Sequence, residues 1–189
     1  TLNSIQYFIY KNDRRESNKY LTMFSQLMRK TLENSQETLI PLQKELDLLE
    51  IYMLLEKLRY KDKFSFEMNI DESVDALDCM IPSLILQPYL ENSVWHGIAN
   101  KEDHGLITLF ITKDKNRLSC IIEDNGIGRE KAKQIKESKQ KTYRSYGTKI
   151  TESRLKIINQ LYGSSLHIST VDLFDDNGEA AGTRVELKI

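Results

Sequence analysis

A carboxylate followed by two closely spaced glycines is the first feature of the sequence that can do chemistry. Asp124 comes directly after an apolar run at 118–123, and Gly126 and Gly128 follow it. Glycine has no Cβ, so the backbone there can come close to a flat or charged ligand. The carboxylate can accept a hydrogen bond from an amine such as the N6 group of adenine. Asp-Asn-Gly is also a favourable turn sequence, so this segment alone fits either a ligand site or a plain turn.

A second group of polar residues lies in segment 87–97, which reads Gln-Pro-Tyr-Leu-Glu-Asn-Ser-Val-Trp-His-Gly. In a helix, Asn92 and His96 lie four residues apart and share a face. Asn offers an oxygen to a hard cation such as Mg²⁺, and His can donate to phosphate. Glu91 can orient a water molecule or accept a proton. The alternative is that Glu91 and Asn92 are solvated and that His96 caps the helix beside Gly97.

A basic segment and a glycine–threonine pair complete the candidate site. Residues 129–149 contain eight Lys or Arg against two Glu. Such a segment suits a lid over a polyanion, and Gly147 can present backbone N–H groups to phosphate. A solvated charged helix is the alternative. Gly182 and Thr183 begin the last strand, where the Thr hydroxyl can reach a base edge.

Composition narrows the class of protein. The 189 residues carry a net charge of −1, with 40% hydrophobic and 29% charged residues, which is a globular balance without a bulk drive toward nucleic acid. Two cysteines, Cys79 and Cys120, build no disulfide framework. Phosphate-loop, nucleophile-elbow and zinc motifs are absent from the sequence, and no apolar run approaches the ~18 residues of a membrane span. The first residue is Thr, so a fragment of a longer protein is expected.

Apolar periodicity predicts a helical hairpin followed by a mixed strand–helix domain, with the boundary near residue 61. Leu90, Val94 and Ile98 share a face that should pack into the core, and Pro88 should kink its helix or mark a restart. A turn is expected at 113–116 and another at 175–178. The expected helices are 20–32, 42–60, 81–98 and 149–161, and the expected strands are 64–70, 106–112, 118–123, 166–171 and 184–189.

The order of these motifs resembles the order of boxes in the GHKL ATP-binding fold. The string 87–97 looks like the N-box of the LytS-type sensor histidine kinases. Segment 145–155 resembles their second glycine box and the helix after it, and segment 46–60 resembles the helix that leads into their ATPase domain. The similarity covers nearly the whole chain.

The resemblance implies an α+β fold: a GHKL-type α/β sandwich with a mixed sheet and helices on one face, preceded by an N-terminal helical hairpin. Residues 1–60 would be a partial dimerisation and phosphotransfer segment, and residues 61–189 the ATP-binding catalytic domain. The implied activity is that of a protein histidine kinase, with Mg²⁺ and ATP as cofactors and a response regulator, often of the LytTR type, as partner. The full-length protein would be a homodimer anchored in the inner membrane through its N-terminal part, with this region in the cytoplasm and no direct contact with nucleic acid.

The family's roles transfer to particular residues. Asp124 would read the adenine amine, Gly126, Ile127 and Gly128 would make room for the base, and Thr183 would lie near it. Asn92 would hold Mg²⁺, His96 would contact phosphate, and Glu91 would position the attacking group or a water. The resemblance also implies four residues of the lid in ATP binding: Lys141, Arg144, Gly147 and Thr148.

Two departures from the family pattern, at Trp95 and in the second glycine box, bear on these roles. Trp95 stands where many histidine kinases have a Lys, so Lys141 or Arg144 would supply that cation. The common Gly-x-Gly-Leu of the second glycine box is Ser-Tyr-Gly-Thr at 145–148. Residues 1–5 match the end of the family's phosphoacceptor string, so the phosphoacceptor His is expected upstream, and the fragment is not expected to phosphorylate itself in cis.

Two other functions remain open. One is a GHKL-fold ATPase of the gyrase sort, in which Glu91 activates water. The other is a non-catalytic interaction module that has lost ATP binding. A helical hairpin ahead of the domain is expected for the kinase and not for the ATPase.

Overall fold

The computed structural model describes residues 14–115, 117–138, 153, 159–160 and 166–189. The chain divides into two compact units. The first contains Thr1–Lys63 and Ala76–Leu84, and the second contains Phe64–Asp75 and Ile85–Ile189. Within the described residues, no helix combines the length and the apolar character that crossing a membrane requires. The first half of the segment expected as a lid forms a helix, α5 (Arg129–Ser138), as the alternative of a charged helix predicted. The rest of that segment and most of the expected helix 149–161 lie outside the described residues.

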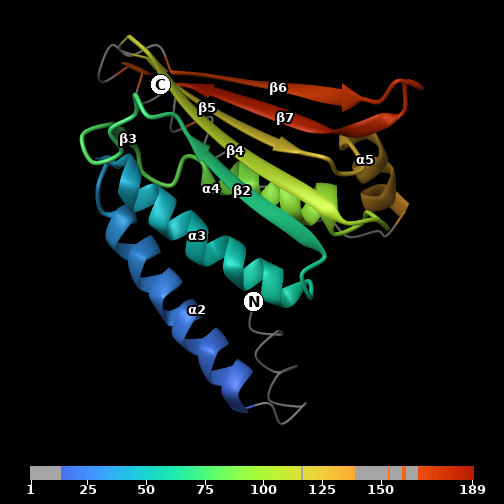
Figure 1. The fold of residues 1–189 in the computed structure, drawn as a ribbon, viewed down its shortest axis with the longest axis horizontal. Coiled ribbons are helices and arrows are strands. Elements are labelled where there is room, and N and C mark those ends of the chain that lie inside the picture. The colour runs from blue at the N-terminus through green and yellow to red at the C-terminus, as the bar shows by residue number, and fades with distance from the viewer. Residues whose placement is uncertain (1–13, 116, 139–152, 154–158, 161–165) are drawn as a thin grey trace. The chain divides into compact units, whose positions relative to one another are not determined.

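The first unit is built on two helices, α2 (Arg14–Ser35) and α3 (Leu42–Arg59), which pack against each other (Figure 1). The predicted helical hairpin is therefore present. Two short strands, β1 (Leu39–Pro41) and β3 (Met80–Pro82), pair antiparallel and bring 80–82 back to the start of α3. The apolar side chains buried in this unit include Tyr20, Leu27, Leu46, Leu49 and Met53.

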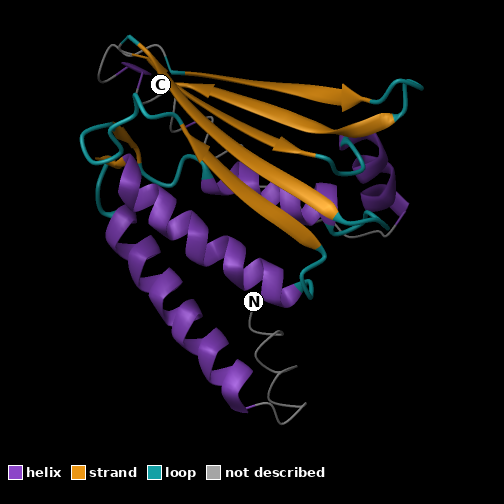
Figure 2. Cartoon of the chain, in the orientation of Figure 1, coloured by secondary structure: helices purple, strands orange, loops and turns teal. Residues whose placement is uncertain are grey.

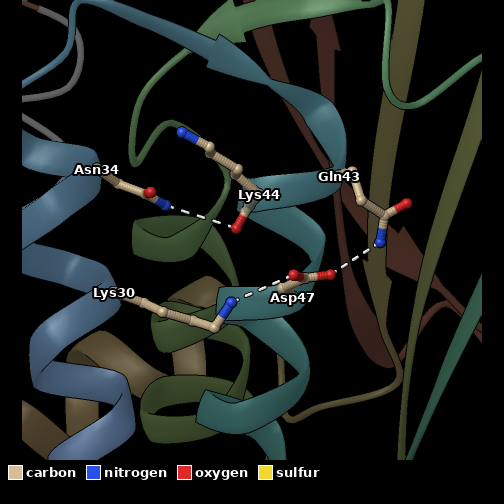
Figure 3. A network of polar contacts seen from close by, with 5 residues as sticks. All are labelled: Lys30, Asn34, Gln43, Lys44 and Asp47. Carbon is tan, nitrogen blue, oxygen red and sulfur yellow. Dashed lines mark hydrogen bonds and ion pairs between the residues drawn. The ribbon is translucent and has the colours of Figure 1, made fainter.

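Two polar contacts join α2 to α3, from Lys30 to Asp47 and from Asn34 to Lys44, and a third within α3 joins Gln43 to Asp47 (Figure 3). Lys30 Nζ lies 3.2 Å from Asp47 Oδ2, and Gln43 Nε2 donates to Asp47 Oδ1 at 2.8 Å. Asn34 Nδ2 donates to the Lys44 carbonyl at 3.5 Å, which is a long hydrogen bond. Both partners of the ion pair are well exposed, so it contributes less than about 1 kcal/mol. The apolar contacts therefore carry most of the stability of the hairpin.

A fully buried carboxylate, Glu45, holds the chain where it leaves β3. Its Oε2 accepts the Leu84 backbone N–H at 2.8 Å. Leu84 has φ +55°, a left-handed conformation that costs a non-glycine residue about 1–2 kcal/mol. The hydrogen bond from Glu45 therefore stabilises a backbone conformation that leucine does not favour by itself.

Glu45→Ala is expected to lower the free energy of unfolding by about 2 kcal/mol, because it leaves the Leu84 N–H without this acceptor. Glu45→Gln keeps an acceptor oxygen and is expected to lose less than half as much. Urea denaturation of the two variants checks this. An equal loss in both would mean that the negative charge, rather than the acceptor, is what the site requires.

The second unit contains a five-stranded mixed sheet in the order β2-β4-β5-β7-β6 (Figures 1 and 2). The first two strands of this order are parallel, and all other neighbours are antiparallel. This confirms the predicted mixed sheet. The strands are β2 (Phe64–Ile70), β4 (Gly105–Asp114), β5 (Arg117–Asp124), β6 (His167–Phe174) and β7 (Ala180–Lys188).

Alternate positions of the central strands are buried, as expected for a sheet covered on one face. Ile107, Leu109 and Ile111 of β4 are buried, and so are Cys120 and Ile122 of β5. The helices α4 (Gln87–Asn92) and α5 (Arg129–Ser138) and the π-helix η1 (Ser93–Ile98) belong to this unit, and η1 contacts β4, β5 and β7. Leu90, Val94 and Ile98 are buried, as their spacing predicted.

The helix predicted at 81–98 was too long at its start. Residues 80–82 are strand β3, and the helix begins only at Gln87. Pro88 lies in the first turn of α4, where its missing N–H costs no hydrogen bond. Pro88 thus marks the start of the helix rather than a kink or restart within it, and the second half of the segment is a π-helix that apolar spacing did not indicate.

The last two strands were predicted too short. β6 continues to Phe174 and β7 begins at Ala180, so their pairing runs past the predicted ends at 171 and 184. The predicted turn is present: Asp175 Oδ1 accepts the backbone N–H groups of Asn177 and Glu179. Small residues at 180–182 carry no apolar signal, yet a bulge with one extra residue on β7 lets them continue the ladder.

Candidate functional site

The carboxylate of Asp124 lies buried at the end of β5, with only 4% of the residue exposed. Its Oδ1 accepts the Gly126 backbone N–H at 2.9 Å, and its Oδ2 accepts the Ser93 hydroxyl at 2.9 Å. The backbone N–H of Thr183, which pairs with Asp124 across β5 and β7, also donates to it. Three elements, the β5 turn, η1 and β7, therefore converge on one side chain.

Burial raises the pKa of the Asp124 carboxyl to about 6, because the ionised group loses its hydration. The hydrogen bonds from Gly126, Ser93 and Thr183 favour the ionised form and lower the pKa, whereas the charge of Glu123 raises it. An ionised carboxylate has about four acceptor sites, and these three donors use three of them. Among the described residues, about one acceptor site of the carboxylate is therefore left without a donor.

Two glycines bring η1 onto the turn after β5. A Cβ built on Gly126 would lie 2.4 Å from the Gly97 Cα, and one on Gly97 would lie 2.8 Å from Asp124 Oδ1. The Ile127 N–H donates to the Gly97 carbonyl at 3.3 Å. Gly128 has φ +76°, and a Cβ there would lie 2.8 Å from the Ala180 Cβ. The close approach that the glycine spacing suggested is thus an approach of backbone to backbone.

Asn125 fixes the turn after Asp124 by hydrogen bonds to Leu106 at the start of β4. Its N–H donates to the Leu106 carbonyl, and its Oδ1 accepts the Leu106 N–H at 2.7 Å. Lys101 Nζ donates to the Asn125 carbonyl at 2.8 Å. These contacts fix the backbone between Asp124 and Gly126.

The N-box residues lie on the helix that reaches Asp124. Glu91 is half-buried and its Oε1 accepts the Gln87 amide at 2.9 Å. Asn92, the last residue of α4, and His96 in η1 are also half-buried, and Trp95 is 42% exposed. Within the described residues, no three His, Cys, Asp or Glu side chains gather as a metal site.

The structure brings together Asp124, Gly126, Ile127, Gly128 and Thr183 with the helix that carries Glu91, Asn92 and His96. The expected lid residues Lys141, Arg144, Gly147 and Thr148 lie outside the described residues. Sequence reasoning missed Ser93 and Gly97 as contacts of Asp124, and Gly182 as a close neighbour of the Asp124 carbonyl. No local sequence feature pointed from Ser93 to Asp124, because the contact joins residues 31 positions apart.

Comparison with known proteins identifies the family. A family model described as histidine kinase matches residues 1–64. The sensor protein LytS of Oceanobacillus iheyensis is 37% identical over 118 residues, which are 62% of this chain and 20% of that protein. The sensor histidine kinase YpdA of Escherichia coli is 31% identical over 149 residues, 78% of this chain and 25% of that protein. The chain thus spans about a fifth to a quarter of the length of these relatives.

Similarity to a solved structure supports the fold. The histidine kinase domain of a blue-light activated histidine kinase from Erythrobacter litoralis matches with a TM-score of 0.50 and 14% identity, covering 90% of this chain and 74% of that chain. Histidine kinase catalytic domains use ATP, and histidine kinases pair with response regulators. The chain is therefore a homologue of the LytS sensor proteins, matches the histidine kinase family model over residues 1–64, and has a fold similar to that of histidine kinase catalytic domains.

Proposed function

We propose that this chain is the ATP-binding catalytic region of a two-component sensor histidine kinase. The observation that carries the proposal is the buried carboxylate of Asp124, to which the described residues give three donors, so that about one of its acceptor sites is left for a ligand. An adenine amine fills that site and also stabilises the ionised form of a carboxylate whose pKa burial has raised. ATP would then supply the phosphoryl group that passes to a histidine and from there to a response regulator.

The base would lie against the turn after β5. Asp124 would read its amine, the turn at Gly126, Ile127 and Gly128 would lie against the ring, and Thr183 pairs with Asp124 from β7. The contacts of Asn125 and Lys101 support this assignment, because a rigid turn presents Asp124 without a cost of ordering on binding.

The phosphates would lie along the helix that carries the N-box. Asn92 offers its amide oxygen to Mg²⁺, His96 donates to phosphate, and Glu91 positions the attacking group. Phosphoryl transfer depends on positioning and charge neutralisation rather than on covalent chemistry by the protein, and these three polar groups suit that task. We place the lid at Lys141, Arg144, Gly147 and Thr148, which would add positive charge and backbone donors.

A kinase is favoured over a GHKL-fold ATPase by the helical hairpin of α2 and α3, which the ATPase does not require. In the ATPase, Glu91 would direct a water molecule at the γ-phosphate. In the kinase, the phosphoryl group goes to histidine. A non-catalytic module is disfavoured by the three donors that keep Asp124 poised as an acceptor.

The wider arrangement follows from the same proposal. Residues 1–60 would serve in dimerisation and phosphotransfer, and residues 61–189 would form the catalytic domain. The full-length protein would be a homodimer anchored in the inner membrane, with this region in the cytoplasm. Its partner would be a response regulator, such as one with a LytTR DNA-binding domain.

The first experiment is thermal unfolding with Mg·ATP. A ligand at about 100 times its dissociation constant adds about 2.7 kcal/mol to the stability of the folded state. For a chain of this size, that corresponds to a rise in melting temperature of about 5–10 °C. Mg²⁺ alone and Mg·GTP are the controls and are expected to give no comparable shift. No shift with millimolar Mg·ATP would overturn the proposal.

A further inference from the structure

The hydroxyl of Ser93 is the buried side-chain donor to the Asp124 carboxylate. Ser93 is only 4% exposed, and its Oγ donates to Asp124 Oδ2 at 2.9 Å across 31 residues of sequence. Buried serines in helices commonly donate to the backbone carbonyl one turn earlier. Ser93 instead directs its proton to a carboxylate on the neighbouring sheet.

The surrounding geometry holds this contact in place. Ser93 begins the π-helical segment η1, which closes with the Ala99 N–H donating to the Val94 carbonyl at 2.8 Å. Gly97, four residues on, lies so close that an added Cβ would be 2.8 Å from Asp124 Oδ1. The helix therefore donates to Oδ2 through Ser93 and passes close to Oδ1 at Gly97, where no side chain would fit, and a π-helical turn is a common feature of functional sites.

The Asp124 carboxylate has little freedom to rotate, because both of its oxygens accept hydrogen bonds. Oδ1 already accepts the Gly126 N–H at 2.9 Å, and Thr183 donates a further backbone N–H. Rotation of the carboxylate about its Cβ–Cγ bond would break the Gly126 and Ser93 bonds together. Without Ser93, the backbone donors would remain, but Oδ2 would lose the only side-chain donor that the described residues give Asp124.

We propose that Ser93 is a positioning residue that determines base specificity: by holding Asp124 Oδ2, its hydroxyl orients the carboxylate so that the free acceptor site takes an amine donor of the base. This inference rests on the proposed function, because it assumes that Asp124 reads the base. It predicts that the site discriminates between ATP and inosine triphosphate (ITP). ITP carries a carbonyl oxygen where ATP carries the N6 amine, and two acceptors facing each other repel.

The test measures the affinities of the whole chain for Mg·ATP and Mg·ITP by titration calorimetry. Wild-type chain is expected to prefer ATP. Ser93→Ala is expected to weaken ATP binding about tenfold, as for loss of one hydrogen bond to a charged group, and to leave ITP binding unchanged. The ATP:ITP ratio then falls about tenfold. Ser93→Thr keeps the hydroxyl and is expected to restore the ratio.

Ser83→Ala is the matched control. Ser83 is also a buried serine, 1% exposed, and its Oγ donates to the Glu37 carbonyl at 2.8 Å within the other unit. The same atoms and one buried hydrogen bond are lost. This variant is expected to change neither nucleotide affinity nor the ATP:ITP ratio.

The outcomes separate the inference from the proposed function. If wild-type chain binds neither nucleotide, the proposed function fails. If it prefers ATP and Ser93→Ala keeps the same ratio, or weakens ATP and ITP equally, Ser93 has at most a structural role and the inference alone fails. Should Ser93→Ala not fold, the near-isosteric Ser93→Cys, with its weaker donor, replaces it, and an unchanged ratio in that variant overturns the inference.

Discussion

Gly182→Ala is expected to destabilise the sheet unit by about 4 kcal/mol or more, through a backbone clash added to conformational strain. Gly182 has φ +138°, a conformation that side chains other than glycine rarely adopt. An added Cβ would lie 1.8 Å from the Asp124 carbonyl oxygen and 2.9 Å from the Asn125 Cα. Both contacts are to backbone, so neither can be relieved by a rotamer change. Chemical denaturation followed by circular dichroism measures the loss.

Gly178→Ala separates strain from packing. Gly178 has φ +80°, but nothing lies within 4 Å of an added Cβ there. This variant is therefore expected to lose about 1 kcal/mol, the cost of the left-handed conformation alone. If the two variants lost the same amount, the close approach of β7 to the end of β5 would be wrong, and with it the placement of Thr183 beside Asp124.

The parts of the fold that the sequence predicts are those determined locally. Alternating apolar residues located β2, β4 and β5, and the spacing of Leu90, Val94 and Ile98 identified the buried face of a helix. The strand–Asp–x–Gly–x–Gly pattern placed a turn at the end of β5, and the turn at Asp175 was visible from its Asp-Asp-Asn-Gly sequence. In each case the residues within a few positions of one another are enough to determine the strand, the helix face or the turn.

The parts that sequence reasoning missed depend on contacts between distant segments. Residues 80–82 form β3 because β1, about forty positions earlier, offers an edge to pair with. Ser93 had no local feature that pointed to Asp124, and Gly97 had a role only once the turn at Gly126 lay against it. The extension of β7 through 180–182 likewise depends on a bulge against β6, which no apolar pattern records.

Asp124→Asn is expected to lower the affinity for Mg·ATP by about 100-fold, because the hydrogen bond from the base amine to a charged acceptor is lost. The domain should remain folded. The Asn oxygen can still accept the Gly126 N–H, and the Asn amide can donate to the Ser93 hydroxyl, which then acts as acceptor. Titration calorimetry with Mg·ATP, beside the melting temperature of each protein, measures both statements. An unchanged affinity would remove the central assignment of the site.

The same substitution is expected to change how stability depends on pH. Burial raises the pKa of Asp124 to about 6 from an ordinary value of 3.8, so between these values the folded state binds more protons than the unfolded state. The free energy of unfolding of the wild-type chain should then fall as pH rises through this window, by about 3 kcal/mol for this one group. Asp124→Asn has no proton to lose, so its stability relative to wild type is expected to increase by about 2.4 kcal/mol between pH 4 and pH 7.5, because part of the change has already occurred at pH 4. Urea denaturation of both proteins at the two pH values tests this, and parallel pH profiles would mean that the carboxylate is not desolvated in the folded chain. A nucleotide amine that donates to Asp124 would stabilise the ionised carboxylate and so reduce the free-energy cost of its burial. The desolvation that lowers the stability of the ligand-free chain would thereby increase its affinity for adenine.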